Sequence, residues 1–442
     1  MRTPTAMRTS SWARPGTMTT ELRASLRRIL WHYIPWLRPL YLFTQYRIIR
    51  PGRIRIARCI AAIAKTSADE KPPRGVIEDV RVCFAENPDM GSLLFTKNFD
   101  WMTRDPTAFG LSSGDELWLK NARPIDVFAL QGARVCSFWG VIISNDNRLV
   151  AEATPKDVPT HSEHSLFMGA RLPRVTRCID RAAVVFTSHV YARNYAHWLF
   201  EVTYRLTLLK SLPDWPDLDA VIANVIDLPF QQELLELAEI PMDKVVQLSP
   251  DLHVKVNMLY ACSNETHGVQ PIPKWLAHSV RNLVLGRSDA DGKRLRARGK
   301  CIYVSRGSSS RRALVNEEEV IEQVSKYGFE VIYPERWTVK EQARIFQGAD
   351  YVVAAHGAAL ANVVFCRWGA RVLELRAPFL PQYAMYGVLA AQCGLKYHWL
   401  DCKVWKPERL RSKIEPELWL DTRKLAEKLQ DLLSDRGLLL SW

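Results

Sequence analysis

The sequence predicts an α/β protein built from two Rossmann-like domains, and two observations lead to this fold class. Short apolar runs alternate with helical patterns between residues 182 and 285, and again between residues 301 and 400. Alternation of this kind is typical of parallel sheets whose strands are joined by crossover helices. The chain of 442 residues is also long enough for two or three domains, and its hydrophobic content of 48% excludes a disordered chain.

The clearest strand–turn–helix–strand unit lies between residues 349 and 376. Residues 350–355 form an apolar run typical of a buried parallel strand, and residues 371–375 form the next one. Between them, a tight turn from His356 to Ala359 leads into a helix expected over Leu360 to Phe365. The free amides at such a helix start bind anionic groups, phosphate above all. The turn therefore predicts an anion site, and a plain turn with a surface histidine is the alternative.

The same alternation of strands and helices is predicted on both sides of this turn. Further strands are predicted at 301–305, 329–333 and 395–400, and the loop at 306–312 is basic. The expected helices lie at 316–327 (Asn316 and Glu319 as cap, Gly328 as stop), 338–347 (Thr338 and Glu341 as capping box), 383–393 and 422–433. No GxGxxG motif follows any of these strands, so a nicotinamide or flavin site is not indicated.

The first Rossmann-like domain begins with a buried strand at 182–188. Asn194 is the expected N-cap of the helix that follows. His197, Glu201 and Arg205 are spaced by four residues, so they share one helical face. The remaining strands of this domain are predicted at 220–226, 245–248 and 258–261, and its helices at 231–239 and 273–285.

Residues 76–153 show a period of two and predict a small β-rich module. Val80, Val82 and Phe84 alternate with polar residues, as in a half-buried strand. Apolar runs at 141–143 and 149–150 flank a turn at 144–148, which predicts a hairpin. No chemical constellation is visible in this module. The full set of expected segments is an arm at 1–70, the β-rich module at 75–175, a first Rossmann-like domain at 180–295, a second Rossmann-like domain at 300–405 and a terminal helix at 410–442.

The N-terminal arm carries nearly all of the excess charge. Residues 1–65 hold twelve Arg and one Lys against a single acid, Glu21, while the whole chain has a net charge of +13. Aromatic and apolar residues between 20 and 65 accompany these arginines, a composition typical of a segment on an anionic membrane surface. A self-packed basic arm and nucleic-acid binding are alternatives, but no nucleic-acid module accompanies the arm. Flotation with anionic vesicles would distinguish them.

The composition predicts a cytoplasmic protein that the arm can hold at the inner face of the membrane. The nine cysteines form no CxxC pair, which favours a reducing compartment over a disulfide framework. No apolar run is long enough to span a bilayer, and no signal-peptide pattern is expected at the N-terminus.

Two separate stretches resemble glycosyltransferase family 61. NYAHWLFEVTYRLTLL, at residues 194–209, is similar to the NYxHWLxE signature of that family. The segment from Cys301 to Phe365 carries an Arg after a strand, an Asn-Glu pair, a Pro-Glu turn before a Gln-bearing helix, and the HGAxLxN loop. The chain is identified as a bacterial-type member on the combination of these pieces in this order.

The resemblance implies a GT-B architecture, in which two facing Rossmann-like domains enclose a cleft. It implies inverting, metal-independent transfer of a hexosyl or pentosyl unit from a nucleotide-sugar donor to a glycan or lipid-linked saccharide. Many bacterial members act in surface or capsular polysaccharide biosynthesis. No cofactor, metal or nucleic acid is implied.

Transfer from a nucleotide sugar requires that the departing diphosphate be stabilised. Arg306, at the tip of a strand, is the first candidate, with Arg311 and Arg312 as alternatives. The candidates that complete the donor site are His356, Gly357, Ala358, Asn362, which holds the loop or the nucleotide, and Glu374, whose carboxylate would accept from ribose hydroxyls.

The acceptor hydroxyl must also lose a proton. His197 could take this proton, with Glu201 one turn further along the helix to orient the ring. The alternative is that these two residues only stabilise the helix or bridge the domains.

Two other functions are alternatives to glycosyl transfer. A non-catalytic polysaccharide-assembly protein would bind the nucleotide sugar without forming linkages. An α/β-hydrolase is excluded because the chain has no GxSxG elbow. Asp289 and Asp291 form an acidic pair that could bind metal, but a solvated turn is the simpler interpretation of so polar a loop.

Overall fold

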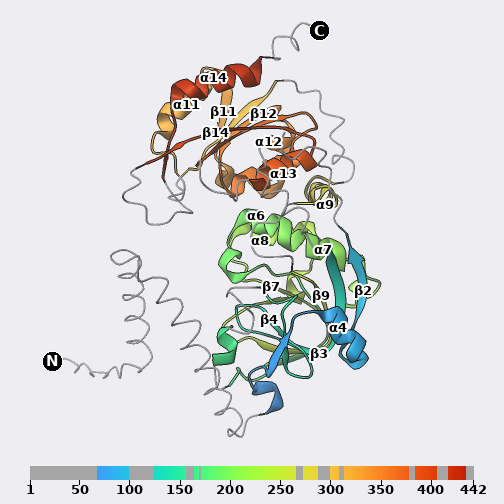
Figure 1. Cartoon of the computed structure of the whole chain (residues 1–442). Coiled ribbons are helices and arrows are strands. Elements are labelled where there is room, and N and C mark those ends of the chain that lie inside the picture. Colours follow the sequence, from blue (N-terminus) through green and yellow to red (C-terminus); the bar gives the residue numbers. More distant parts are fainter. Residues whose placement is uncertain are drawn as a thin grey trace, which may run out of the picture. The chain divides into compact units, whose positions relative to one another are not determined.

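The computed structural model describes residues 67–98, 124–155, 164–168, 171–264, 272–286, 299–307, 313–377, 384–405 and 417–434 (Figure 1). The basic arm at 1–65, Arg311, Arg312 and the pair Asp289 and Asp291 lie outside these residues. The chain divides into two compact units, of which the smaller comprises residues 1–72 and 162–172. In its described part, the Leu172 amide donates to the carbonyl of Glu70 over 2.8 Å.

The larger unit contains a nine-stranded sheet with the order β1-β5-β4-β3-β9-β6-β7-β8, and β2 pairs with β3 at its side. The strands are β1 (Gly75–Ile77), β2 (Gly91–Lys97), β3 (Ile125–Cys136), β4 (Val141–Ile143), β5 (Arg148–Val150), β6 (Arg177–Val184), β7 (Ala220–Ala223), β8 (Val245–Gln247) and β9 (His253–Cys262). Strands β6 to β9 pair in parallel, whereas β9 joins β3 in antiparallel register. The segments expected at 75–175 and 180–295 therefore share one sheet, and the hairpin predicted at 141–150 is confirmed.

One expected strand is wrong. Residues Val80–Glu86 form helix α4, where the alternation of Val80, Val82 and Phe84 had predicted a strand. Asp79 caps this helix, because its carboxylate accepts from the amides of the second and third helical residues. Val80, Cys83 and Phe84 are buried while Val82 is exposed, which is helical spacing rather than alternation.

Helices cover the face of this sheet opposite α4. They are α6 (Tyr195–His197), α7 (Thr203–Leu209), α8 (Pro229–Leu237) and α9 (Lys274–Leu285). They share a core with Val127, Ala183 and Val221. The alternate strand residues, such as Phe128 and Ala182, face the core beneath α4.

The second sheet is fully parallel, with the order β11-β10-β12-β13-β14. Its strands are β10 (Cys301–Val304), β11 (Phe329–Ile332), β12 (Tyr351–Ala355), β13 (Arg371–Arg376) and β14 (Lys396–Asp401). Numbered along the chain, this is the doubly wound order 2-1-3-4-5, which reverses between β10 and β12. Ligands bind outside the carboxyl ends of strands at such a reversal. Arg306 and His356 follow the two strands that flank it.

Helices lie on both faces of this second sheet (Figure 1). Helices α11 (Glu317–Ser325) and α14 (Thr422–Leu433) share the core of one face, so the terminal helix packs on this sheet. Helices α12 (Val339–Gln347) and α13 (Ala384–Gln392) lie on the other face with a 3₁₀ helix, Ala358–Phe365. A short two-stranded sheet, β15 (Lys403–Val404) with β16 (Leu418–Trp419), completes the fold.

Two of the predicted helix-end signals are confirmed, and the predicted cap at Asn316 is not. Thr338 and Glu341 form the expected capping box at the start of α12, and Gly328 has the positive φ of 78° expected of a helix stop. Asn316 precedes α11, but its side chain makes no cap bond. It accepts from the amide of Leu420 and donates to the carbonyl of the same residue, and so joins the terminal segment to the domain.

Hydrogen bonds connect helices of the first sheet to elements of the second. Glu233 of α8 accepts from the first two amides of α12, over 2.6 and 3.0 Å. The guanidinium of Arg281, on α9, donates to the carbonyls of Val364 and Cys366. These contacts join α8 to α12 and α9 to the end of the 3₁₀ helix.

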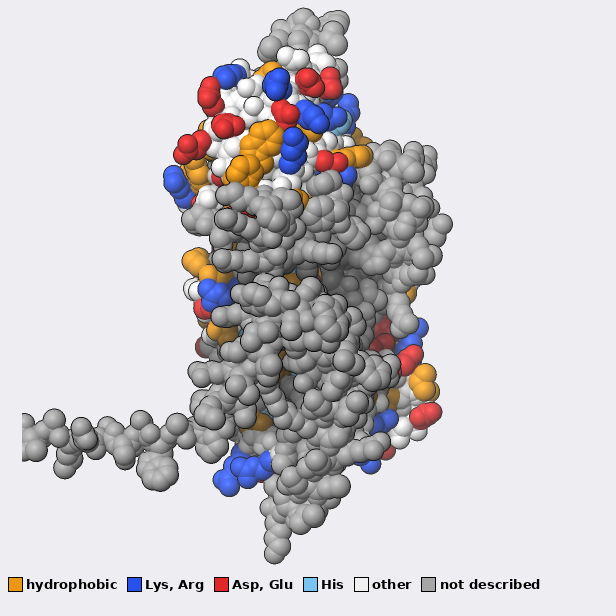
Figure 2. Space-filling model, turned by 60° about the vertical axis from the view of Figure 1, so that its left-hand side comes forward, with side chains coloured by type: hydrophobic (Ala, Val, Ile, Leu, Met, Phe, Trp, Pro, Cys, Tyr) orange, Lys and Arg blue, Asp and Glu red, His pale blue; other side chains and the backbone are white. Residues whose placement is uncertain are grey.

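Where Figure 2 shows described residues, mainly at the top of the view, acidic, basic and hydrophobic side chains are interspersed. No helix within the described ranges has the length and apolar character needed to cross a membrane.

Candidate functional site

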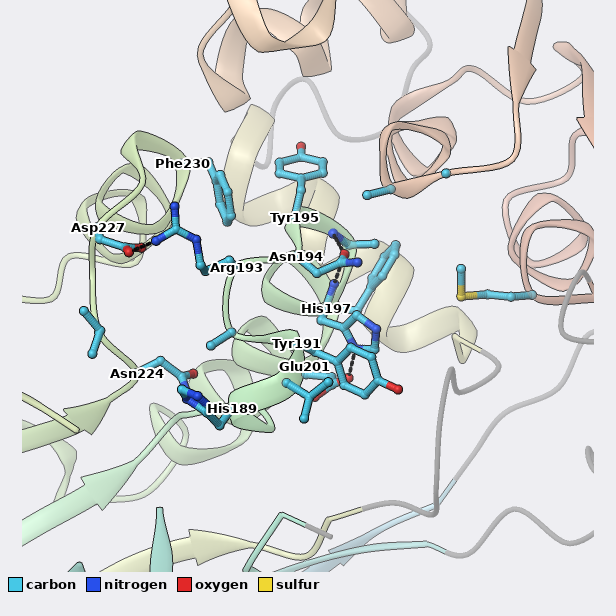
Figure 3. A pocket seen from close by; sticks show the side chains of 18 of the residues that line it. His189, Tyr191, Arg193, Asn194, Tyr195, His197, Glu201, Asn224, Asp227 and Phe230 are labelled. Carbon is cyan, nitrogen blue, oxygen red and sulfur yellow. Dashed lines mark hydrogen bonds and ion pairs between the residues drawn. The ribbon is translucent and has the colours of Figure 1, made fainter. Parts of the chain in front are cut away.

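A cavity of about 1040 Å³ lies at the carboxyl ends of several strands (Figure 3). Residues that follow β6 and β7 line one side, and among them are His189, Tyr191, His197 and Glu201. Another part of the lining comes from the HGA turn, His356 to Ala358, together with Met385 and Tyr386 of α13. The predicted base and the predicted anion turn therefore meet in one cavity.

His197 is held on a carboxylate inside this cavity (Figure 3). Asn194 caps the helix start as predicted, since its side chain accepts from the amides of Ala196 and His197. The ring nitrogen Nδ1 of His197 pairs with Glu201 Oε1, one turn further on. Residues Trp198–Val202 form a π-helical turn, a feature found mostly at functional sites.

Two further residues contact the His197–Glu201 pair. The hydroxyl of Thr187, just after β6, donates to Glu201 Oε2. The ring of Tyr191 stacks on that of His197, with centroids 4.1 Å apart and planes 5° from parallel. The contact of Nδ1 with Glu201 and the stacked ring of Tyr191 together orient the imidazole of His197.

The charge of Glu201 follows from its surroundings. Burial alone would raise the pKa of this carboxyl, but hydrogen bonds from His197 and Thr187 and the nearby positive charge of Arg205 bring the pKa below the ordinary 4.5. Glu201 is therefore ionised at neutral pH and accepts Nδ1–H from the imidazole. Its contribution to stability is present above the unfolded-state pKa and is lost as the pH falls through the lower folded-state pKa.

The HGA turn carries a second histidine on a second carboxylate. His356 is 8% exposed, and its Nδ1 pairs with Glu374 Oε1. The Tyr397 hydroxyl donates to the other oxygen of Glu374, whose side chain is fully buried in β13. Glu374 was expected to accept from ribose hydroxyls, but it lies beneath His356 and does not line the cavity.

Arg306 lies directly against the turn. Its Nη1 donates to the carbonyl of His356 over 2.8 Å. A Cβ at Gly357 would overlap this nitrogen, so a larger residue there would displace the end of the guanidinium from its present place. Gly357 has an extended φ of 172°, so the requirement for glycine is one of space and not of backbone strain. Arg306 thus supports the turn from behind and places a positive charge at the sheet's switch point.

The model of the family described as Glycosyltransferase 61 matches residues 195–373. Residues 195–373 belong to glycosyltransferase family 61. The match begins at Tyr195, inside the NYAHWLFE signature, and ends in β13. It contains His197, His356 and Arg306, whereas His189, the third histidine of the cavity lining, lies outside it. The predicted resemblance is confirmed, and the family indicates that the protein is a glycosyltransferase. No curated protein matches the chain.

Within the family-61 segment, Asn362 has a connecting role. Its Oδ1 accepts from the Tyr195 hydroxyl over 2.7 Å, and its Nδ2 donates to Gln342 over 2.8 Å. Asn362 is fully buried and does not line the cavity, whereas Tyr195 does. The residue predicted to hold the loop or the nucleotide therefore connects the helix start that carries His197 to the 3₁₀ helix after the HGA turn.

Sequence reasoning missed the part of the cavity that lies outside the family-61 segment. Phe138, in the turn between β3 and β4, lines the cavity and packs on His189 with ring centroids 4.5 Å apart. Val190 is also in this part of the lining and is 64% exposed, whereas Val225, which is 45% exposed, lines the cavity from within the family-61 segment. No local motif marks Phe138. Its turn comes well before His189 in the sequence, and the two meet only because β3 pairs with β9 and β9 pairs with β6.

The described residues contain no group of three or more His, Cys, Asp and Glu side chains that could hold a metal ion. Of the predicted donor-site groups, His356, Gly357 and Ala358 line this cavity, whereas Arg306 lies behind the turn and is not in the lining.

Proposed function

We propose that this protein is an inverting, metal-independent glycosyltransferase that moves a hexosyl or pentosyl unit from a nucleotide sugar to a glycan acceptor in surface or capsular polysaccharide biosynthesis. One observation supports this proposal above the others. The carboxylate-bound His197 and the HGA turn line the same cavity, so a base and an anion-binding turn can act on one substrate pair.

On the donor side, the HGA turn would receive the diphosphate. The amides of Gly357, Ala358 and Ala359 precede the first hydrogen bond of the 3₁₀ helix, which runs from the Leu360 amide to the Gly357 carbonyl. Amides at a helix start favour anions, and the charge of Arg306 adds to this preference. The diphosphate would thus lie at the switch point of the second sheet.

On the acceptor side, His197 would act as the general base. Glu201 takes the Nδ1–H of the imidazole, so Nε2 is the nitrogen that accepts the proton of the acceptor hydroxyl. The resulting oxygen attacks the anomeric carbon from the side opposite the diphosphate. The bond between this carbon and the diphosphate oxygen breaks, and its electron pair leaves with the diphosphate. A single displacement of this kind inverts the anomeric configuration.

The proposed function is tested by turnover of the full chain. We expect thermal stabilisation by one family among UDP-, GDP-, CMP- and dTDP-sugars, and transfer from that donor to a saccharide acceptor. The product should have the inverted anomeric configuration by NMR, and the rate should persist in EDTA. Binding without transfer would favour the non-catalytic assembly protein. Loss of activity in EDTA with recovery in manganese would contradict metal independence.

The exposed apolar wall around Phe138 would contact the acceptor. A pyranose ring has an apolar face of C–H groups that packs on aromatic rings, and ligand pockets are commonly lined in this way. We expect Phe138→Ala to raise the KM for a saccharide acceptor about 2- to 10-fold, since an aromatic contact is worth about 0.5–1.5 kcal/mol. The KM for the donor should not change.

Steady-state kinetics with each substrate varied in turn measure this effect. Trp337→Ala is the matched control, because Trp337 is a half-exposed aromatic residue that does not line the cavity. An equal rise in the donor KM, or an unchanged acceptor KM, would remove Phe138 from the acceptor site.

A further inference from the structure

Two of the three imidazoles that line the cavity, His197 and His356, are each paired with a carboxylate but differ in their surroundings. Nδ1 of His197 pairs with Glu201, and Nδ1 of His356 pairs with Glu374. Glu201 itself lines the cavity, and its side chain is 26% exposed. Glu374 has no exposed surface at all. The two carboxylates therefore differ in how strongly they need a positive partner, because a charge removed from water needs compensation nearby.

The second carboxylate has two donors. An ionised carboxylate only accepts hydrogen bonds, and the Tyr397 hydroxyl donates to Glu374 Oε2 while His356 Nδ1 meets Oε1. Burial raises the pKa of Tyr397, so this phenol keeps its proton and remains a donor. Nδ1 of His356 then carries hydrogen, so Nε2 accepts in the neutral ring and donates only in the imidazolium.

The charged and titratable groups around His356 come from several elements. Among the described residues they include Arg306 after β10, Glu374 and Arg376 of β13, Tyr397 of β14, Tyr386 of α13 and His197 across the cavity. Among these, Glu374 is the carboxylate in contact with the ring, and it is fully enclosed. An imidazolium at His356 would be the counterion in direct contact with an ionised Glu374.

We propose that His356 acts on the leaving group as an imidazolium, and that Glu374 and Tyr397 are positioning residues that keep it protonated and oriented. The proposal rests on the function proposed above. As the bond to the anomeric carbon breaks, the electron pair moves onto the diphosphate oxygen, and Nε2–H of His356 donates a hydrogen bond to it. The acceptor proton goes to His197, so proton acceptance and leaving-group stabilisation are divided between the two histidines.

Glu374→Gln separates this role from simple packing, because the amide keeps the size of the side chain and can still accept from Nδ1–H. We expect kcat to fall about 10- to 100-fold, as for other groups that orient a functional histidine, with a smaller change in the donor KM. Loss of the carboxylate should also weaken the imidazolium. The basic limb of the pH–rate profile should therefore move to lower pH in the variant. Tyr397→Phe should act in the same direction with a smaller effect.

A spectroscopic measurement makes the inference independent of turnover. ¹⁵N-histidine NMR, with the His356 signals assigned by their loss in His356→Ala, should show both ring nitrogens protonated near pH 7 in the wild-type protein. In Glu374→Gln, one nitrogen should be deprotonated at the same pH. A neutral His356 in the wild type would overturn the inference.

The inference and the proposed function can fail separately. If the wild type transfers sugar and both variants keep its kcat and pH profile, the inference is wrong and the transferase stands. If Glu374→Gln does not fold, the same measurements on Tyr397→Phe decide. If no donor is turned over, the NMR result still shows whether Glu374 maintains an imidazolium.

Discussion

Replacing His197 by alanine is expected to lower kcat by about 10²- to 10⁴-fold, the usual worth of a positioned general base. The imidazole is held for this task by three contacts: the carboxylate of Glu201, the stacked ring of Tyr191 and the capped helix start. Binding of the donor should be nearly unchanged, because the expected diphosphate contacts belong to the HGA turn. Rapid-quench measurement of a single turnover at saturating donor separates the chemical step from binding.

The matched control is His278→Ala, since this histidine is exposed on α9 and lies outside the cavity. Glu201→Gln should lower kcat by an intermediate amount. The amide can still accept from Nδ1–H of His197, but it lacks the negative charge of the carboxylate. The acidic limb of the pH–rate profile should disappear in His197→Ala if this side chain is the base. Retention of both the rate and the acidic limb would assign the base elsewhere and leave His197 a helix-stabilising role.

Much of the second sheet could be predicted because its signals are local. A strand buried on both faces is a continuous apolar run, as at β12, and helix ends carry their own markers, such as Thr338 with Glu341 and Gly328. The anion turn is likewise a short motif at the end of such a strand. These features depend on neighbours within about one helical turn, and a single sequence contains that information.

The errors arose where distant contacts decide the outcome. The alternation at Val80–Phe84 agrees with both a strand and a short helix, and the structure is decided by the cap at Asp79 and by packing against the first sheet. The role of Glu374 depends on parallel register, which places it beside Trp399 of β14 and brings Tyr397 and His356 to its carboxylate. No spacing in the sequence relates Glu374 to a histidine 18 residues earlier.

The donor site leads to a prediction with two matched substitutions. Arg306→Ala should weaken the binding of a nucleoside diphosphate about 10- to 150-fold, because a charge-assisted hydrogen bond is worth about 1.5–3 kcal/mol. Gly357→Ala should cause a loss of similar size, since the added Cβ would occupy the place of the guanidinium Nη1. Isothermal titration calorimetry with the nucleoside diphosphate of the preferred donor measures both. Gly348→Ala is the control, because its added Cβ would meet only ordinary contacts of 3.5 Å and its φ of −79° suits alanine.

The double variant decides whether the two residues act as one unit. If Gly357 is required only to admit Arg306, then Gly357→Ala should add little once Arg306 has been replaced by alanine, because the displaced group is already absent. The two losses should therefore be far from additive, with a coupling energy close to the smaller of them. Additive losses would mean that the added methyl group obstructs the diphosphate directly, and that Arg306 contacts the donor independently of the turn. Unchanged affinity in a folded Arg306→Ala protein would remove the arginine from the donor site altogether.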